Sequence, residues 1–278
     1  MIRPRELSRS LELFSALTPT LLPATHTNSY ALGSREVLLV EPATPYVDEQ
    51  RAWIEWARSL PSRGRQAVAI VATHHHPDHV GGLDVLSREL GLPVWAHHET
   101  ATLLEPKLIT RELAEGETIH LDGPIPGAWR VLHTPGHDWG HICLFEEETR
   151  TLVVGDMVAS IGTILIAPGD GDMRIYLEQL ERLEKLDARL ALPAHGEPID
   201  APSALFRKYI VHRLKREAKV MGALGARAQS EEDLVAIAYD DTPAHIWPIA
   251  LLSLRAHLEK LSYEGRATQV DGRWSTFA

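Results

Sequence analysis

The sequence predicts a mixed α/β fold over its first two hundred residues and a smaller, helical region after them. Apolar runs of strand length, such as 67–72, alternate with amphipathic helical patterns, such as 174–186. The chain has 278 residues, 44% hydrophobic and 24% charged, which is typical of one large globular domain with a smaller appendage. After Pro202 the pattern becomes helical and basic. We therefore expect one domain at 1–203 and a second at 204–278.

Local patterns place the elements of the first domain. Runs of strand-forming residues predict strands at 28–33 and 36–41, joined by Gly33-Ser34, and then at 67–72, 93–97, 117–121, 129–133, 142–146, 151–154 and 190–192. Apolar residues at helical spacing predict helices at 47–60, 83–90 and 174–186. Gly91 is typical of the residue that closes a helix. Trp53 and Trp56 are expected in the core.

The C-terminal region reads as three helices and a short hairpin. The helices are expected at 204–224, 230–239 and 246–261, and the hairpin at 265–277. Ser230 and Asp233 resemble a capping box. The first of these helices is rich in cations: Arg207, Lys208, Arg213, Lys215, Arg216 and Lys219. Three helices and a wing predict a winged-helix-like module, although its third helix offers few basic residues to a DNA groove.

Charge and cysteine content narrow the function classes. The net charge is −10; residues 1–204 hold 17 Lys and Arg and 29 Asp and Glu, whereas residues 205–278 hold 11 and 9. The acidic bulk argues against tight nucleic-acid binding without excluding it, because bound metal changes the local field. The single cysteine, Cys143, excludes an intrachain disulfide and a cysteine-based zinc site. Without a signal-peptide core or a membrane-length apolar window, we expect a soluble cytoplasmic protein, with a homodimer as one option.

The segment 73–82 reads Thr-His-His-His-Pro-Asp-His-Val-Gly-Gly and directly follows the strand predicted at 67–72. In extended backbone, residues two apart point the same way, so His74, His76 and Asp78 can line one side. The following proline keeps His76 out of the helical region. Imidazoles and a carboxylate at this density suit a metal such as zinc. The alternative, a solvated histidine-rich loop, loses weight because later segments offer more donors.

Three later segments carry these donors: His-Thr-Pro-Gly-His-Asp-Trp-Gly-His at 133–141, Gly-Asp at 155–156, and Pro-Ala-His-Gly at 193–196. With the histidine-rich segment they resemble the metallo-β-lactamase fold superfamily, over roughly residues 20–200. The resemblance implies an αββα sandwich. It also implies a full set of metal ligands: His74, His76 and His137 for one ion, Asp78, His79 and His195 for the other, and Asp156 bridging them.

The resemblance further implies two zinc ions, with manganese or iron also tolerated, and a bridging hydroxide that attacks the substrate. Asp78 can orient this hydroxide. The two cations outweigh Asp78, Asp156 and the hydroxide by about one charge, which suits an anionic or oxyanion-forming substrate. His141 has two open roles: contact with the substrate, or a hydrogen bond that orients a ligand. Trp139 either walls the pocket or packs in the interior.

Three functions remain open. The first is a dinuclear hydrolase of the lactamase-like protein 2 type, whose bacterial relatives carry a winged-helix module, with single-stranded RNA as a candidate substrate. The second is a hydrolase of a small-molecule ester or thioester, because the Thr-His-His-His form resembles glyoxalase II. The third is a mononuclear iron dioxygenase of the persulfide type, disfavoured because His79 and His195 complete a second site. A β-lactamase is also disfavoured, because its best-known subclass has Cys where Asp156 stands.

Overall fold

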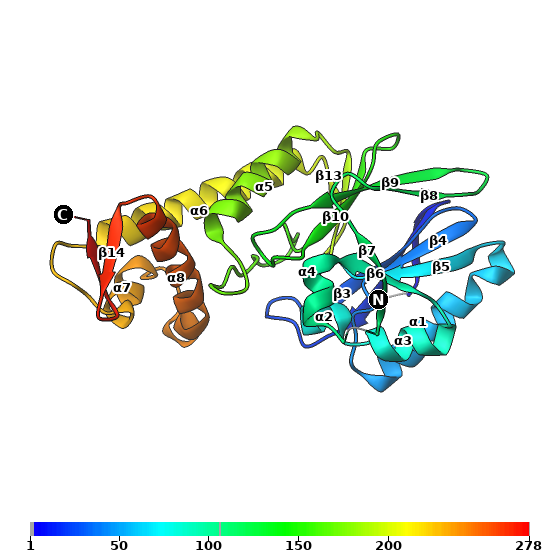
Figure 1. Ribbon diagram of the computed structural model, residues 1–278, viewed down its shortest axis with the longest axis horizontal. Helices are drawn as coiled ribbons and strands as arrows, with labels where there is room; N and C mark the ends of the chain where they lie inside the picture. The colour runs from blue at the N-terminus through cyan, green and yellow to red at the C-terminus, as the bar shows by residue number, and fades with distance from the viewer. Residues whose placement is uncertain (1–2, 106, 278) are drawn as a thin grey trace. The chain divides into compact units, whose positions relative to one another are not determined.

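The computed structural model describes residues 3–105 and 107–277, which divide into two compact units (Figure 1). The first unit holds the chain up to Thr134, with Trp139–Thr163 and Asp187–Pro202. The second holds Pro135–Asp138, Ile164–Leu186 and the chain from Ser203 onward. Segments from before residue 204 thus belong to the second unit. A domain boundary at 203/204 stays a prediction.

A seven-stranded sheet occupies the first part of the first unit, with its strands in sequence order. They are β1 (Arg5–Ser8), β2 (Leu11–Leu17), β3 (His26–Leu32), β4 (Glu36–Val40), β5 (Gln66–Val71), β6 (Val94–His97) and β7 (Ile109–Leu113). The pairs from β1 to β4 are antiparallel, and those from β4 to β7 are parallel. Helices α1 (Val47–Ser59) and α3 (Leu83–Leu90) contribute Trp53, Trp56 and Leu86 to a core cluster that includes Phe14 and Leu39 of this sheet. Both tryptophans are buried, as predicted.

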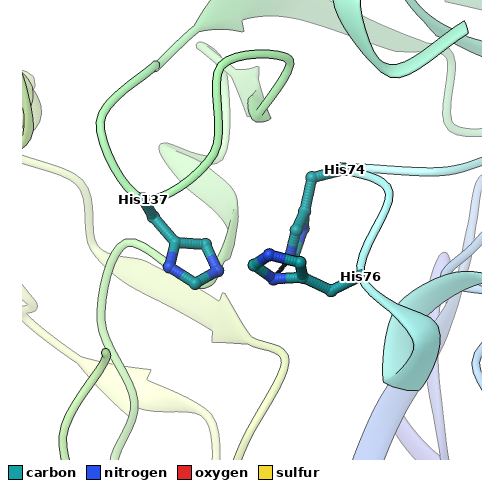
Figure 2. A group of neighbouring side chains, drawn as sticks. All are labelled: His74, His76 and His137. Carbon is teal, nitrogen blue, oxygen red and sulfur yellow. Dashed lines mark hydrogen bonds between the residues drawn. The ribbon is translucent and has the colours of Figure 1, made fainter. Parts of the chain in front are cut away.

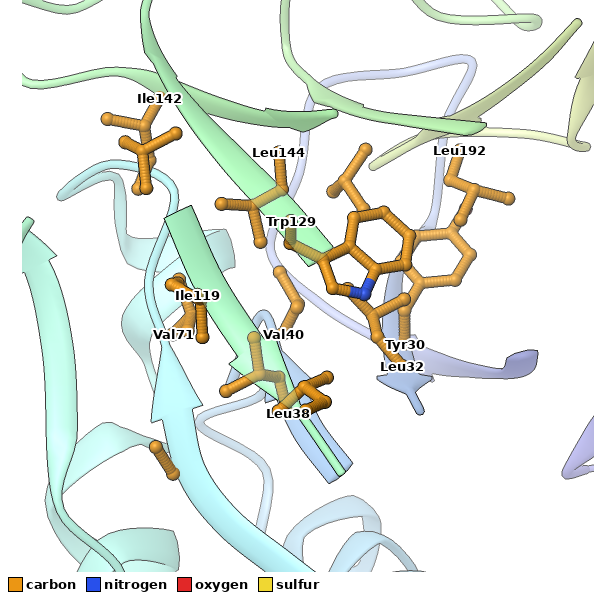
Figure 3. Close-up of a cluster of buried hydrophobic side chains, with 14 of the residues drawn as sticks. Tyr30, Leu32, Leu38, Val40, Val71, Ile119, Trp129, Ile142, Leu144 and Leu192 are labelled. Atoms are coloured by element: carbon orange, nitrogen blue, oxygen red, sulfur yellow. The ribbon is translucent and has the colours of Figure 1, made fainter. Parts of the chain in front are cut away.

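A six-stranded sheet faces the first one. Its order is β13-β12-β11-β10-β9-β8, formed by β8 (Thr118–Leu121), β9 (Gly127–His133), β10 (Ile142–Glu146), β11 (Thr151–Gly155), β12 (Leu190–Pro193) and β13 (Ile199–Asp200). Apolar side chains of the two sheets form one buried cluster, in which Leu38 and Val71 meet Leu144 and Leu192 (Figure 3). Burial of this shared face is the main stabilising term of the sandwich.

Two loops leave the second sheet together. Strands β11 and β12 are parallel, and Gly155 is paired with Pro193 at their ends. The residues that follow each strand, Asp156 and His195, therefore emerge at the same edge. Gly155 has φ +50, and a Cβ there would lie 2.5 Å from His141 Nε2, so glycine is required at the turn.

The second unit is helical with a small hairpin. It contains α5 (Met173–Lys185), α6 (Ser203–Ala223), α7 (Glu231–Ala238), η2 (Ala244–Ile246), α8 (Trp247–Tyr263), β14 (Ala267–Val270) and β15 (Arg273–Thr276). The predicted capping box is present, because Ser230 and Asp233 each accept from the other's backbone N–H. Leu234, Leu258 and Trp274 join helices and hairpin in one core. Among the described residues, no helix is both long and apolar enough to cross a membrane.

Helix α6 is less basic toward solvent than its sequence indicates. Arg213 is buried and donates to the Ile164 carbonyl. Arg216 Nη1 is 2.9 Å from Asp241 Oδ1, and Lys219 Nζ is 2.9 Å from Asp241 Oδ2. The ion pairs of Arg216 and Lys219 offset part of the positive charge predicted for this helix. Their acidic partner, Asp241, comes from the loop after α7.

A buried histidine gives the second unit a pH-dependent stability. His257 of α8 is fully buried, and its ring nitrogens have no hydrogen-bond partner among the described residues. Its Nδ1 lies 3.9 Å from Oε2 of Glu217 of α6, a carboxylate that also pairs with Lys260 and Arg266. Burial lowers the pKa of His257, and the charge of Arg213 lowers it further against the opposing effect of Glu217.

Because this pKa is lower in the folded than in the unfolded chain, the folded state binds fewer protons below about pH 6.5. The stability from neutral, buried His257 is complete above that pH and is lost as the pH falls toward the folded pKa. We expect His257→Leu to reduce the drop in thermal midpoint between pH 7.5 and pH 5.5. His245→Leu, at an exposed position, is the control. An equal drop in wild type and His257→Leu would refute this assignment.

Candidate metal centre

The histidine-rich segment leaves β5 as predicted but does not stay extended. Pro77–Val80 forms a short helix, α2, so Asp78 and His79 are presented by a helical turn rather than by alternation along a strand. The expectation of one extended side was wrong beyond His76, because Pro77 at the first helical position starts this turn. His76 itself has φ −59 and ψ 143, outside the helical region, as its following proline requires.

Four side chains converge at the edge where β11 and β12 end. His79 Nε2 lies 3.8 Å from Asp78 Oδ2 and 3.6 Å from Asp156 Oδ2. His195 Nε2 lies 3.5 Å from Asp78 Oδ2 and 3.4 Å from Asp156 Oδ1. Ligand atoms of Asp78, His79 and His195 all lie within 4.8 Å of one another, so this set can hold a metal ion. Imidazole nitrogen and carboxylate oxygen are common ligands of zinc.

The outward ring nitrogens of both histidines are already engaged. His79 Nδ1 is 3.1 Å from Glu41 Oε1, and His195 Nδ1 is 3.0 Å from the His26 carbonyl. A proton on each Nδ1 leaves Nε2 as the acceptor that faces the carboxylates. His79 Nε2 is buried and has no hydrogen-bond partner among the described residues. A buried nitrogen lone pair between two carboxylates fits a cation.

A second donor set contains His74, His76 and His137, whose ligand atoms also lie within 4.8 Å of one another. Figure 2 shows the three rings turned toward one another. His74 Nε2 is 2.9 Å from His76 Nδ1. His137 Nδ1 lies 2.9 Å from the Leu165 carbonyl, which leaves Nε2 for a metal. Six of the seven residues predicted as ligands thus belong to these two sets, and the seventh, Asp156, faces His79 and His195.

The carboxylates and imidazoles of this site shift one another's pKa values toward their charged forms. Burial alone would raise the pKa of Asp156, but His195 and His79 hold it well below its usual value. Burial alone would lower the pKa of His79, yet Glu41, Asp156 and Asp78 raise it well above the ordinary range. The pKa of His195 is also raised, against burial, mainly by Asp156. The carboxylates therefore favour positive charge at this edge, and a bound cation can supply it.

His141 is fully buried and faces the protein interior. Its Nδ1 is 2.8 Å from Thr134 Oγ1, and its Nε2 accepts the Asp156 backbone N–H at 3.1 Å. Of the two roles left open for His141, this geometry favours the one that orients a metal ligand. Trp139, the other open residue of this loop, is partly exposed.

We expect His141→Ala to lower kcat by roughly tenfold to a hundredfold through the loss of Asp156 orientation, with little change in KM. The change should be the same for chemically different substrates, because the ring contacts none of them. Steady-state kinetics on two substrates checks this. A KM effect seen with only one substrate would restore the role in substrate contact.

Two supporting residues were not predicted. Glu41 follows β4, is buried, and has φ +63; its carboxylate accepts from Thr73 Oγ1 at 2.5 Å and faces His79. Asn28 of β3 donates its side-chain amide to the carbonyls of Pro193 and Gly196, at 3.0 and 2.7 Å, on either side of His195. The sequence signal for Glu41 was a strand pattern that ends in Glu-Pro. No pattern in the sequence marked Asn28 as a supporting residue.

A two-sheet sandwich with imidazoles and carboxylates at one edge defines a metal-binding α/β protein. Residues 22–195 match the family model described as the metallo-beta-lactamase superfamily, and the chain belongs to that superfamily. Residues 230–274 match the beta-lactamase associated winged helix domain. Both the resemblance and the fold class predicted from the sequence are confirmed. The superfamily consists mainly of hydrolases, and its fold implies binding of a divalent metal.

Proteins similar to this chain match it over most of its length. A protein named Beta-lactamase-like protein 2 homolog from Drosophila melanogaster is 28% identical, covering 94% of this chain and 90% of its own length. An Atrochrysone carboxyl ACP thioesterase from Aspergillus chevalieri is 29% identical, covering 71% of this chain and 60% of its own. Two solved structures share the fold. A metallo-beta-lactamase family protein from Thermus thermophilus has a TM-score of 0.79 at 24% identity, over 98% of this chain and all of that one. A beta-lactamase domain protein from Burkholderia ambifaria has a TM-score of 0.83 at 22% identity, over 98% and 93%.

Proposed function

We propose that this chain is a dinuclear metal-dependent hydrolase of the lactamase-like protein 2 type, which uses water rather than a protein side chain as its nucleophile. The observation that supports this proposal most is the position of the Asp156 carboxylate. Its two carboxylate oxygens face different histidines of the set Asp78, His79 and His195: His79 through Oδ2 and His195 through Oδ1. Such a carboxylate is suited to a site rich in positive charge.

In this proposal His74, His76 and His137 hold one ion. Asp78, His79 and His195 hold the other, and Asp156 is shared. We expect zinc, with manganese or iron as alternatives. The bound metals supply a nucleophile by lowering the pKa of water to about 7 from about 15.7. Asp78, the more exposed of the two carboxylates, accepts a hydrogen bond from the attacking water, and His141 orients Asp156 through its backbone N–H.

We propose two candidate substrate classes for this hydrolase. A small-molecule ester or thioester is favoured by the similarity to a protein named as a thioesterase. Single-stranded RNA stays a second proposal, weakened because Arg216 and Lys219 of α6 are paired with acidic residues. A mononuclear iron dioxygenase is disfavoured, because Asp78, His79 and His195 form a donor set in addition to that of His74, His76 and His137. A homodimer stays a prediction.

The test uses the full chain, stripped with a chelator and reloaded with zinc, manganese or iron(II). We expect two metal ions per chain by elemental analysis and hydrolysis that returns only with metal. The substrates are an acyl-glutathione thioester and a labelled single-stranded RNA, with His137→Ala as the control for contaminating enzymes. Fewer than two bound ions, or turnover that survives in both the stripped protein and the mutant, would refute the dinuclear hydrolase.

A further inference from the structure

Given the hydrolase proposed above, we infer that its substrate is an acyl thioester, and that the acyl chain lies on an apolar surface beside His195. This surface, here called the acyl surface, consists of Leu21, Leu22 and Ile161. They come from the β2–β3 loop, 18–25, and from the segment 157–163 that follows Asp156. The loop and the segment belong to the first unit.

The β2–β3 loop approaches the side of His195 that faces the metal. Thr20 Oγ1 lies 3.5 Å from His195 Nε2, the nitrogen directed at Asp78 and Asp156. The next two residues are strongly exposed, Leu21 at 51% and Leu22 at 83%. Exposed leucines in sequence directly after a residue at the metal edge form a ready contact for an apolar ligand.

The segment 157–163 reaches the same histidine from its backbone side. Ser160 N donates to the His195 carbonyl at 3.2 Å, and Ile161 is 41% exposed. The segment also touches the loop, because a Cβ added to Gly162 would lie 3.0 Å from Pro23 Cδ. The leucines and Ile161 therefore flank one ligand of the proposed centre.

Charge separates the two substrate classes. Residues 18–25 and 157–163 contain no Lys, Arg, Asp or Glu. A phosphodiester chain draws most of its affinity from Lys and Arg contacts, and neither segment offers one. An acyl chain instead gains about 0.8 kcal/mol for each methylene group removed from water. The acyl surface therefore favours an acyl substrate over RNA.

The leaving group follows from the acid–base inventory. The ionisable side chains that face His195, which are Asp78, His79 and Asp156, are all assigned to metal ions, so a leaving group that departs without a proton donor is favoured. A thiol has a pKa of about 8.5 and leaves as a thiolate far more readily than an alcohol leaves as an alkoxide. In the reaction, the water oxygen bonds to the carbonyl carbon, the C–S bond breaks with its electron pair on sulfur, and the two protons of water end in solvent and on the thiol at neutral pH.

The test measures kcat/KM for acyl thioesters of N-acetylcysteamine, from acetyl to decanoyl, with the metal-loaded full chain. This thiol arm is uncharged, so only the acyl chain varies. We expect kcat/KM to rise roughly fourfold per methylene before it levels off. Leu22→Ser and Ile161→Ser should flatten this dependence. Ile125→Ser, an exposed apolar position at the β8–β9 turn, should keep the wild-type dependence.

Failure of this inference is distinct from failure of the hydrolase. Thioester hydrolysis with no dependence on chain length, or with wild-type dependence in Leu22→Ser and Ile161→Ser, would overturn the acyl surface and leave the hydrolase standing. RNA cleavage that is lost in His137→Ala, without thioester turnover, would do the same. No metal-dependent hydrolysis of either substrate would overturn both.

Discussion

Replacing Asp156 with alanine is expected to abolish hydrolysis while the sandwich stays folded. Asp156 faces both His79 and His195, at 3.6 and 3.4 Å, and it offers each of them a different carboxylate oxygen. Its removal leaves two buried imidazoles with Asp78 as their remaining shared carboxylate and removes the ligand proposed to join the two ions. Loss of an outer partner of a metal ligand costs roughly 10- to 100-fold, and loss of a shared ligand should exceed that. We expect more than about 100-fold loss of kcat and fewer than two metal ions per chain.

The matched control is Asp122→Ala, because the Asp122 side chain is 78% exposed and pairs at the surface with Arg35. Elemental analysis gives the metal content, steady-state kinetics gives kcat, and circular dichroism reports the fold. Wild-type turnover in metal-replete, folded Asp156→Ala would refute the bridging role. A variant that fails to fold is replaced by Asp156→Asn, which keeps the size of the side chain and removes its charge.

The donors of the candidate site were readable from the sequence because metal chemistry demands particular side chains. His74, Asp156 and His195 each follow a strand. Because the pairing of the strands brings their ends together, the donors meet whatever the sequence of the intervening residues. The path of the backbone was less predictable. Asp78 was expected on an extended chain and lies on a helical turn, because the proline before it both excludes His76 from a helix and starts one.

Strand β2 shows what local patterns cannot give. Its sequence Leu-Glu-Leu-Phe-Ser-Ala-Leu does not read as a buried strand, yet Glu12 is buried. The Trp56 indole donates to its carboxylate at 2.9 Å, and Arg63 pairs with it at 2.7 Å. A buried charge is tolerated only with such partners, and they lie more than forty residues away in the chain. The positive charge predicted for α6 was overestimated for the same reason. Asp241 is distant in sequence from Arg216 but forms an ion pair with it.

Replacing Glu41 with glutamine is expected to weaken metal binding by Asp78, His79 and His195 by roughly 10- to 100-fold. Glu41 Oε1 accepts a hydrogen bond from the Thr73 hydroxyl at 2.5 Å and lies 3.1 Å from His79 Nδ1. Its negative charge therefore keeps the His79 proton on Nδ1 and leaves Nε2 directed at the metal. Glutamine keeps the size of the side chain but loses the charge and gains a donor. The backbone supports this role, because a non-glycine residue at φ +63 carries a conformational cost that its contacts must offset.

The readouts for Glu41→Gln are metal affinity by titration with a chelator and the visible absorption of the cobalt-loaded protein, which reports ligand geometry. Turnover should recover in part at saturating metal, because the ligands themselves remain. Glu146→Gln is the matched control. Glu146 is also buried, and its carboxylate accepts a hydrogen bond from the Thr149 N–H at 2.7 Å, but it stabilises a turn rather than the metal edge. It should lower the thermal midpoint and leave metal affinity unchanged. If both variants lose stability alike and neither changes metal affinity, Glu41 supports the fold alone; a selective loss in Glu41→Gln establishes that the strained residue after β4 sets the direction of a metal ligand.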